Sequence, residues 1–448
     1  MRTCKYLSTI YLLLFAGVIA VSGQILPVIK APRPATLSTG VITGQPDSRT
    51  NTAPNTPSPP GFNNRNQQQM EMYGRDRIEV ERRMEMQRMA NEPPEGFPSI
   101  QYELPSCAGL QGTEQFYHAA EKLMDMLNGK TPMNLKEAVF MVENAYFEGQ
   151  LDKKMYENRI LEMAIIARSK AIQDGYNWND PMVKNVMLYR VMADTLNVKL
   201  PGQEKPSTSF PVQYDFEDYW GREDHSKLFV YKLLSAHTGQ CHSMPLLYLI
   251  LCEATGTDAN LAFSPHHSYI KFKDKRNDWH NLELTNGRIT SDAFVTGSGF
   301  INSAALKHHI YMEPQTRKQV IALCLADLAG GYTHKYGYDG FVIQCADSAL
   351  AYAPGNISAL ALKANYHSAC FEYTAEQAGW PPMDILKTYY PRIYGLLVER
   401  NSYYRKIDEM GFVEMPPEIY EKWLNSVNEE KERREHDTRY RNIIRLIK

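Results

Sequence analysis

The sequence has no surplus of either charge. Its 448 residues include 49 Lys and Arg against 51 Asp and Glu, which leaves a formal net charge of -2 at neutral pH. A basic field for the capture of nucleic acid phosphates is therefore not expected. Apolar residues make up 43% and charged residues 22%, values typical of a soluble globular protein. The composition therefore predicts no nucleic acid partner.

Cysteine is scarce, with seven residues in the chain. No two cysteines form a CxxC pair, and their spacing fits no zinc-binding template, so the sequence predicts no metal and no other cofactor. Export of the protein would permit disulfides. A chain of this length does not need them, so no obligatory disulfide framework is expected.

Long hydrophobic runs are confined to the N-terminus. Arg2 and Lys5 precede an apolar run at 10–21, and small residues follow up to Gly23. This order is typical of a secretory signal peptide over residues 1–23. The run is shorter than the ~20 residues that a stable membrane span needs, so no span is expected after cleavage; an uncleaved anchor is the alternative. Cleavage predicts a protein of the periplasm or cell envelope, or a secreted one.

The following segment lacks apolar periodicity. Residues 24–67 contain eight prolines interleaved with Thr, Ser, Asn and Gly, which is typical of a disordered tether. Residues 71–90 are dense in Glu, Arg and Met and predict a helix that is either solvated or bound to a partner. The tether with this helix is assigned to residues 24–98, where prolines end it.

Three folded regions follow from the periodicity of the remaining chain. Residues 99–205 predict N-terminal helices. Residues 206–313 predict a small core, in which an apolar helix ended by Gly256 is followed by two strand-like runs joined as a β-hairpin. Residues 314–448 are helical again. The predicted helices are 114–129, 134–147 with Asn134 as its cap, 152–173, 179–196 and 241–255, and the predicted strands are 267–272 and 279–285.

The C-terminal region contains one repeat-like stretch. Residues 325–354 resemble a tetratricopeptide repeat, because Ala349 and Pro354 fall where that repeat has its small residue and its proline. Stable arrays need about three repeats, so this one is expected to pack on its neighbours; a plain helical hairpin is the alternative. A charged, solvated helix is expected over residues 417–448.

Cys241 is the first candidate catalytic residue. It follows Gly239 and Gln240 and opens the apolar helix, where the helix macrodipole favours the nucleophilic thiolate. The alternatives are a buried structural cysteine and a zinc site formed with neighbouring histidines, whose spacing matches no known cage. The histidines of that zinc alternative are His242, His266 and His267.

A thiolate nucleophile needs a histidine base that a third group orients. If the hairpin is centred at Lys275, His267 lies directly opposite Glu283, with their Cβ atoms about 5 Å apart. An imidazole there would hydrogen-bond the carboxylate and keep its other nitrogen for the thiol. His266 is expected to pack beside the site, and upstream residues are candidates for support of an oxyanion hole. These upstream candidates are Asp218, Trp220, His225 and His237.

The order of a cysteine at a helix start, a histidine opening a strand and an acid on the next strand resembles that of the transglutaminase-like superfamily, in its bacterial form. The strings GQCHSMPLLYLIL, SPHHSYIKF and WHNLELTNG carry this resemblance, near residues 235–300. It implies Cys241 as nucleophile, His267 as base and Glu283 as acid, although the family usually has Asp in the third place. The flanking helices are similar to those of exported Bacteroidota proteins.

The predicted fold class is α+β and mainly helical. A small transglutaminase-like core, with a helix on an antiparallel sheet, is expected between N-terminal helices and C-terminal tetratricopeptide-like hairpins. One functional hypothesis is cysteine-dependent acyl transfer or amide hydrolysis on a protein or peptide, which Cys241 and His267 favour. The other is a non-catalytic cell-envelope scaffold that binds partners through its repeat-like helices, which Glu283 and the repeat favour.

We predict that the mature chain begins at or near Gln24, because a short apolar run between basic and small residues directs export and cleavage. N-terminal sequencing of the protein from its native cells tests this. An intact Met1 on a cytoplasmic protein would contradict it.

Overall fold

The computed structural model describes residues 98–218, 221–285, 288–298 and 301–413, with Glu418, Lys422 and Asn425 as single residues. The predicted signal peptide, nearly all of the predicted tether, and the predicted helix over 417–448 apart from those three residues lie outside this part of the chain. None of the helices described within it is long and apolar enough to cross a membrane. The fold is α+β and mainly helical, as predicted.

The N-terminal helices lie close to their predicted positions. Asn134 caps the second helix, because its Oδ1 accepts the Glu137 N–H at 2.9 Å. The predicted helix 179–196 is wrong at its end, since the alternating burial of Leu196 and Val198 suits a strand that pairs across the next loop. The elements are α3 (Thr113–Leu127), α4 (Leu135–Tyr146), α5 (Lys153–Gln173), α6 (Pro181–Ala193) and the antiparallel pair β1 (Leu196–Val198) and β2 (Ser207–Ser209).

The middle region contains the predicted helix and the predicted hairpin, and the hairpin is part of a larger sheet. Four strands form an antiparallel sheet in the order β5-β6-β7-β8, of which β6 and β7 are the predicted hairpin. The two outer strands were not predicted. The elements are β3 (Gln213–Tyr214), η1 (His225–Leu228), α7 (Val230–Ala236), β4 (Thr238–Gly239), α8 (Ser243–Thr255), β5 (Asn260–Ser264), β6 (His267–Lys273), β7 (Trp279–Glu283) and β8 (Arg288–Thr290).

Helix α8 is buried on nearly all sides, as its apolar sequence predicts. One flank meets the β5–β8 sheet, whose Ile270, Phe272 and Leu282 belong to the same hydrophobic cluster as the leucines of α8. The other flanks meet α4, α5, α6 and α7. Gly256 ends the helix in the left-handed conformation at φ 61°, as expected of a C-cap glycine.

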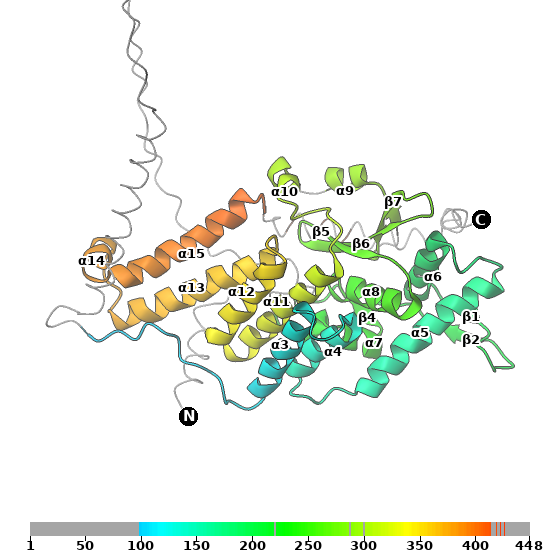
Figure 1. The fold of residues 1–448 in the computed structure, drawn as a ribbon, viewed down its shortest axis with the longest axis horizontal. Coiled ribbons are helices and arrows are strands. Elements are labelled where there is room, and N and C mark those ends of the chain that lie inside the picture. Colours follow the sequence, from blue (N-terminus) through cyan, green and yellow to red (C-terminus); the bar gives the residue numbers. More distant parts are fainter. Residues whose placement is uncertain are drawn as a thin grey trace, which may run out of the picture.

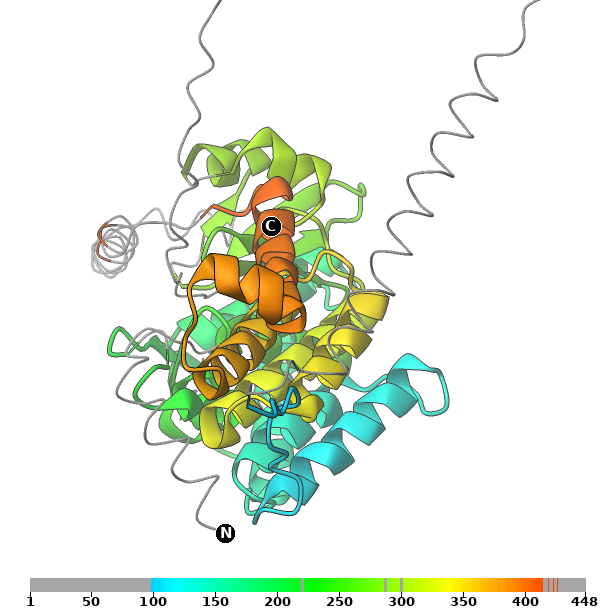
Figure 2. The same cartoon turned by 90° about the vertical axis from the view of Figure 1, so that its left-hand side faces the viewer.

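The C-terminal region is a run of helices that continues from the core (Figure 1). Helices α11 and α12 form the hairpin at the repeat-like residues, and α11 also packs on α3 and α4. Helices α13 and α15 lie side by side, and α14 connects them at the end that faces the viewer in Figure 2. The elements are α9 (Asp292–Ser298), α10 (Ser303–Lys307), α11 (Arg317–Tyr336), α12 (Gly340–Tyr352), α13 (Ile357–Gln377), α14 (Met383–Tyr389) and α15 (Pro391–Glu409).

We predict that Tyr248→Phe destabilises the fold by about 1–3 kcal/mol, because it leaves the buried amide oxygen of Asn185 without its partner. The Tyr248 hydroxyl donates to Asn185 Oδ1 at 2.8 Å between α8 and α6. Tyr352→Phe is the matched control, since its hydroxyl makes the same bond to Asn128 Oδ1 at 2.6 Å at an exposed position. Chemical denaturation measures both free energies of unfolding; equal losses would contradict the role of burial.

Candidate functional site

Cys241 lies in the first turn that leads into α8. The Met244 N–H donates to the Gln240 carbonyl at 3.0 Å, so the helical turn already begins at Gln240. Gly239 permits this close turn, because a Cβ there would lie 2.8 Å from Ser243 Oγ and from a Leu233 methyl carbon. The predicted position of Cys241 at a helix start is therefore confirmed. Its side chain is buried, with 6% of the residue surface exposed.

The start of β6 holds Cys241 from the sheet side. The His267 side chain adjoins the Cys241 thiol, and this interaction helps to raise the pKa of His267. The next residue, Ser268, donates its hydroxyl to the Cys241 carbonyl. Two consecutive strand residues therefore contact the same cysteine, His267 at its side chain and Ser268 at its backbone. This double contact fixes where the thiol stands relative to the imidazole.

His267 is also paired with Glu283, as the sequence predicts. Its Nε2 lies 2.5 Å from Glu283 Oε2, and both residues are largely buried. With Nε2 engaged by the carboxylate, Nδ1 is the nitrogen left for the cysteine. The structure therefore brings all three predicted residues, Cys241, His267 and Glu283, into one connected group.

The predicted register of the hairpin is wrong by one residue at its centre. Ile270 pairs with Leu282, which centres the hairpin at Arg276 instead of Lys275. The cause is the turn, in which the Asp274 carboxylate accepts the N–H groups of Arg276 at 2.8 Å and Asp278 at 3.0 Å. Glu283 therefore reaches His267 diagonally from the same face of the sheet, a span for which the longer Glu side chain is suited.

Thr285 fixes the second oxygen of the acid. Its N–H and its hydroxyl donate to Glu283 Oε1 at 3.0 and 2.7 Å, which leaves Oε2 directed at His267. Burial raises the pKa of Glu283, but positive His267 and the bonds from His267 and Thr285 bring it below its ordinary value of 4.5. The carboxylate is therefore charged at neutral pH.

The charge of Glu283 controls the charge of His267. Burial lowers the pKa of His267, but the Glu283 carboxylate and the hydrogen bonds with Cys241 and Glu283 outweigh it and raise the pKa to about 10. The site thus holds an imidazolium at neutral pH. A cationic histidine beside a cysteine favours the thiolate, the form that attacks carbonyl carbon.

A second buried group of acids and a histidine begins at His242, the residue after Cys241. This group was not predicted from the sequence. His242 Nε2 lies 3.3 Å from Asp327 Oδ2 of α11, and although burial lowers the pKa of His242, the Asp327 charge raises it overall. Glu143 of α4 accepts the N–H groups of Val230 and Tyr231 at 2.6 and 2.8 Å, and burial raises its pKa to about 8. One signal was present: each acid interrupts an apolar helix face.

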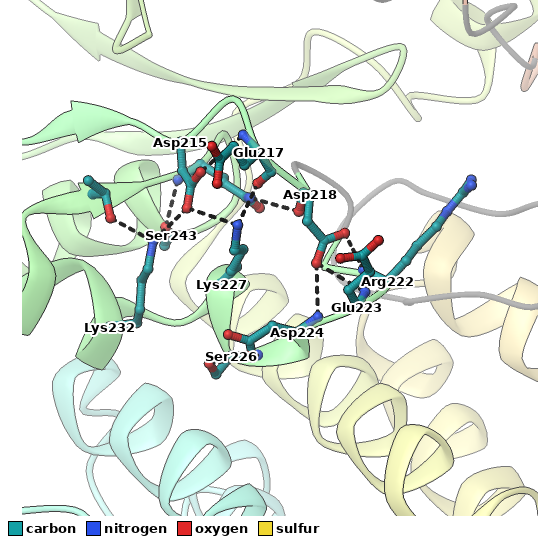
Figure 3. Close-up of polar contacts among 12 residues, drawn as sticks. Asp215, Glu217, Asp218, Arg222, Glu223, Asp224, Ser226, Lys227, Lys232 and Ser243 are labelled. Atoms are coloured by element: carbon teal, nitrogen blue, oxygen red, sulfur yellow. Dashed lines mark hydrogen bonds and ion pairs between the residues drawn. The ribbon is translucent and has the colours of Figure 1, made fainter.

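The loop before η1 supports the turn that carries Cys241. The Asp218 carboxylate accepts the N–H groups of Arg222, Glu223 and Asp224 at 2.8 to 3.0 Å (Figure 3). The Asp218 carbonyl accepts a hydrogen bond from Gln240 Nε2 at 3.1 Å. Of the predicted upstream candidates, Asp218 therefore supports the residue before Cys241.

The other predicted candidates have different surroundings. His225 is buried and stacks on His334 at 5.1 Å between ring centroids, and His237 contacts Arg159 with Nε2 and Nη2 2.6 Å apart. Trp220 lies outside the described residues. His266 sits in the turn before β6, where its ring contacts Phe412. No three His, Cys, Asp or Glu side chains in the described ranges are placed to hold a metal ion, and no disulfide joins the six cysteines found there.

No family model matches this chain, and no curated protein matches it. The crystal structure of menin, which reveals the binding site for the Mixed Lineage Leukemia (MLL) protein, contains a chain similar to this one. The two are 14% identical, over 76% of this chain and 93% of that chain, with a TM-score of 0.30. A likeness at that TM-score carries no inference about fold or function.

We predict that Glu283→Gln destabilises the protein by about 1–3 kcal/mol near pH 6, because the buried imidazolium loses its carboxylate partner. The His267 contribution is complete below its ordinary pKa of 6.5 and is lost as pH rises through about 10. The Glu283 contribution is present above 4.5 and is lost as pH falls through its lowered pKa. The difference from wild type should therefore be largest between pH 4.5 and 6.5 and shrink on either side.

The exposed pair of His309 and Glu313, whose Nδ1 and Oε1 lie 2.7 Å apart, provides the control. Glu313→Gln should cost less than about 1 kcal/mol, as surface ion pairs do. Denaturation across the pH range measures both variants. A pH-independent difference for Glu283→Gln would contradict the charged pair.

Proposed function

We propose that this chain is an exported, transglutaminase-like protein that performs cysteine-dependent acyl transfer or amide hydrolysis on a protein or peptide. The observation that carries the proposal is the 2.5 Å bond between His267 and Glu283 at the position where the imidazole also interacts with the Cys241 thiol. A nucleophile, its base and a group that orients the base are the three parts that covalent acyl transfer requires. The helix of Cys241 packs on the sheet that contains the other two residues, which supports the resemblance.

Each residue has a defined part in the proposed reaction. The Cys241 thiolate forms a bond to the substrate carbonyl carbon, and the His267 imidazolium gives its proton to the leaving amine as the carbon–nitrogen bond breaks. Water or a second amine then attacks the thioester, with neutral His267 accepting its proton and Cys241 leaving as the thiolate. Glu283 stays ionised throughout and stabilises the imidazolium.

The first turn of the cysteine helix supplies charge stabilisation for this step. Peptide N–H groups at a helix start have no partner within the helix, and that of Cys241 is the natural first donor to a developing oxyanion. The bonds from Gln240 to Asp218 and to Ser243 keep this turn in place. The proposed chemistry needs no metal or cofactor.

A non-catalytic scaffold is the second candidate, and burial favours it. Cys241 and His267 expose only 6% and 4% of their surfaces, whereas a substrate carbonyl must reach the sulfur. The C-terminal helices meanwhile present large apolar side chains, such as Trp380 with 58% of its surface exposed. Such exposed aromatic residues are frequent in surfaces that bind other proteins.

We predict that brief alkylation of the native protein near neutral pH labels Cys241 before the other described cysteines. All six are buried, so accessibility alone does not single it out, whereas the adjacent imidazolium does. Cys252 of the same helix is the internal control, because burial raises its pKa. Mass spectrometry of the labelled peptides measures the order.

His267→Ala should abolish the preference for Cys241, and Glu283→Gln should weaken it. Uniformly slow labelling of all six cysteines in the wild type would reject the activated nucleophile. If, in addition, wild type and Cys241→Ala captured the same envelope protein equally well, the scaffold function would replace the enzyme.

A further inference from the structure

We propose that Phe412, which follows the end of α15, is a positioning residue that holds the His266–His267 turn and so keeps His267 aligned with Cys241. This inference rests on the proposed function of the Cys241, His267 and Glu283 group. It begins from the contact between Phe412 and His266, whose ring centroids lie 6.0 Å apart in an edge-to-face arrangement. Such pairs of rings prefer an edge-to-face geometry, so this contact restrains where the His266 ring can lie.

The backbone of His266 has an uncommon conformation that neighbouring contacts can stabilise. Its backbone has φ 55°, in the left-handed region that residues with a side chain adopt uncommonly. It is buried and directly precedes the first residue of β6. A change in the His266 backbone is therefore passed to His267 through one peptide unit.

The end of α15 fixes the direction of Phe412. Gly411 is left-handed at φ 88°, its N–H donates to the Asp408 carbonyl at 2.9 Å, and the Phe412 N–H donates to the Ile407 carbonyl at 3.3 Å. This is the bonding of a Schellman-type helix end, in which the residue after the glycine turns back toward the protein. The backbone of Phe412 is therefore held by hydrogen bonds to the last turn of α15.

A second contact fastens the same helix end to the core. Asn302, the cap of α10, accepts the Ala305 N–H at 2.8 Å and donates to the Gly411 carbonyl at 3.1 Å. A Cβ on Gly411 would lie 2.3 Å from the Ala305 nitrogen, a separation that real atoms do not reach. Glycine is required here because the two helix ends meet backbone to backbone.

The other end of α15 lies far from the site. The helix runs beside α13 from α14 to the neighbourhood of α10 (Figure 1). A helix is a stiff element, so a shift of the α13–α15 unit displaces Gly411 and Phe412 together.

The test follows the rate at which iodoacetamide labels Cys241 in the full chain as a function of pH. Phe412→Ala should slow labelling near neutral pH by at least about tenfold, since small misplacements of a catalytic group have effects of that size. Its labelling profile should also move to higher pH, toward that of His267→Ala. Phe412→Tyr keeps the ring edge and should restore the wild-type profile.

Two further variants separate positioning from loss of stability. Phe412 lines a cavity of about 130 Å³, and Ile357 lines the same cavity from α13, so Ile357→Ala enlarges it without removing the ring beside His266. Ile357→Ala should keep the wild-type profile. Gly411→Ala, which forces the helix end away from α10, should reproduce the shift of Phe412→Ala, and it replaces that variant if Phe412→Ala does not fold.

A wild-type profile in Phe412→Ala, or an equal shift in Ile357→Ala, would overturn the proposal while leaving the catalytic group intact. Failure of the proposed function has a different signature, because wild type and His267→Ala would then label alike.

Discussion

The bond between His267 and Glu283 is the interaction on which the site depends. Both side chains are buried between β6, β7 and the turn before α8, where a lone charge would be strongly destabilising. Together they are stable as an ion pair, because Thr285 completes the bonding of the carboxylate and the interaction with Cys241 also favours the charged imidazole. Each charge of the pair stabilises the other, because positive His267 lowers the pKa of Glu283 and negative Glu283 raises the pKa of His267.

The rest of the molecule keeps this pair dry and in place. The β5–β8 sheet covers one flank of the cysteine helix, and helices α4 to α7 cover the others. A second buried pair, His242 and Asp327, ties the start of α8 to α11. The flanking helices therefore help to hold the site in place. Phe412, after the end of α15, adds a contact to His266 from a helix whose other end lies far from the site.

Local sequence signals were enough for the elements that carry the three site residues. The apolar run ended by Gly256 predicted α8, and alternating runs around a polar turn predicted β6 and β7. Contact of His267 with Glu283 followed from their shared face. The exact pairing did not, because the turn is set by how Asp274 bonds the backbone of Arg276 and Asp278, and several turn geometries suit that sequence.

Contacts between distant segments account for what the sequence did not predict. Strand β5 is short and joins the sheet only by pairing with β6. Glu143 and Asp327 lie on helices whose spacing predicted packing, but which helix each would face depends on tertiary structure. Phe412 is one apolar residue after a helix-ending glycine, a common pattern, and only the fold places it against His266.

The most direct test of this account is nitrogen NMR of the His267 ring near pH 8, assigned by comparison with His267→Ala. The ion pair predicts that both ring nitrogens carry protons at that pH, well above the ordinary histidine pKa of 6.5, and that Glu283→Gln converts the ring to a neutral form. A neutral His267 ring in the wild-type protein would contradict the central claim, which is that His267 and Glu283 form an ion pair beside Cys241.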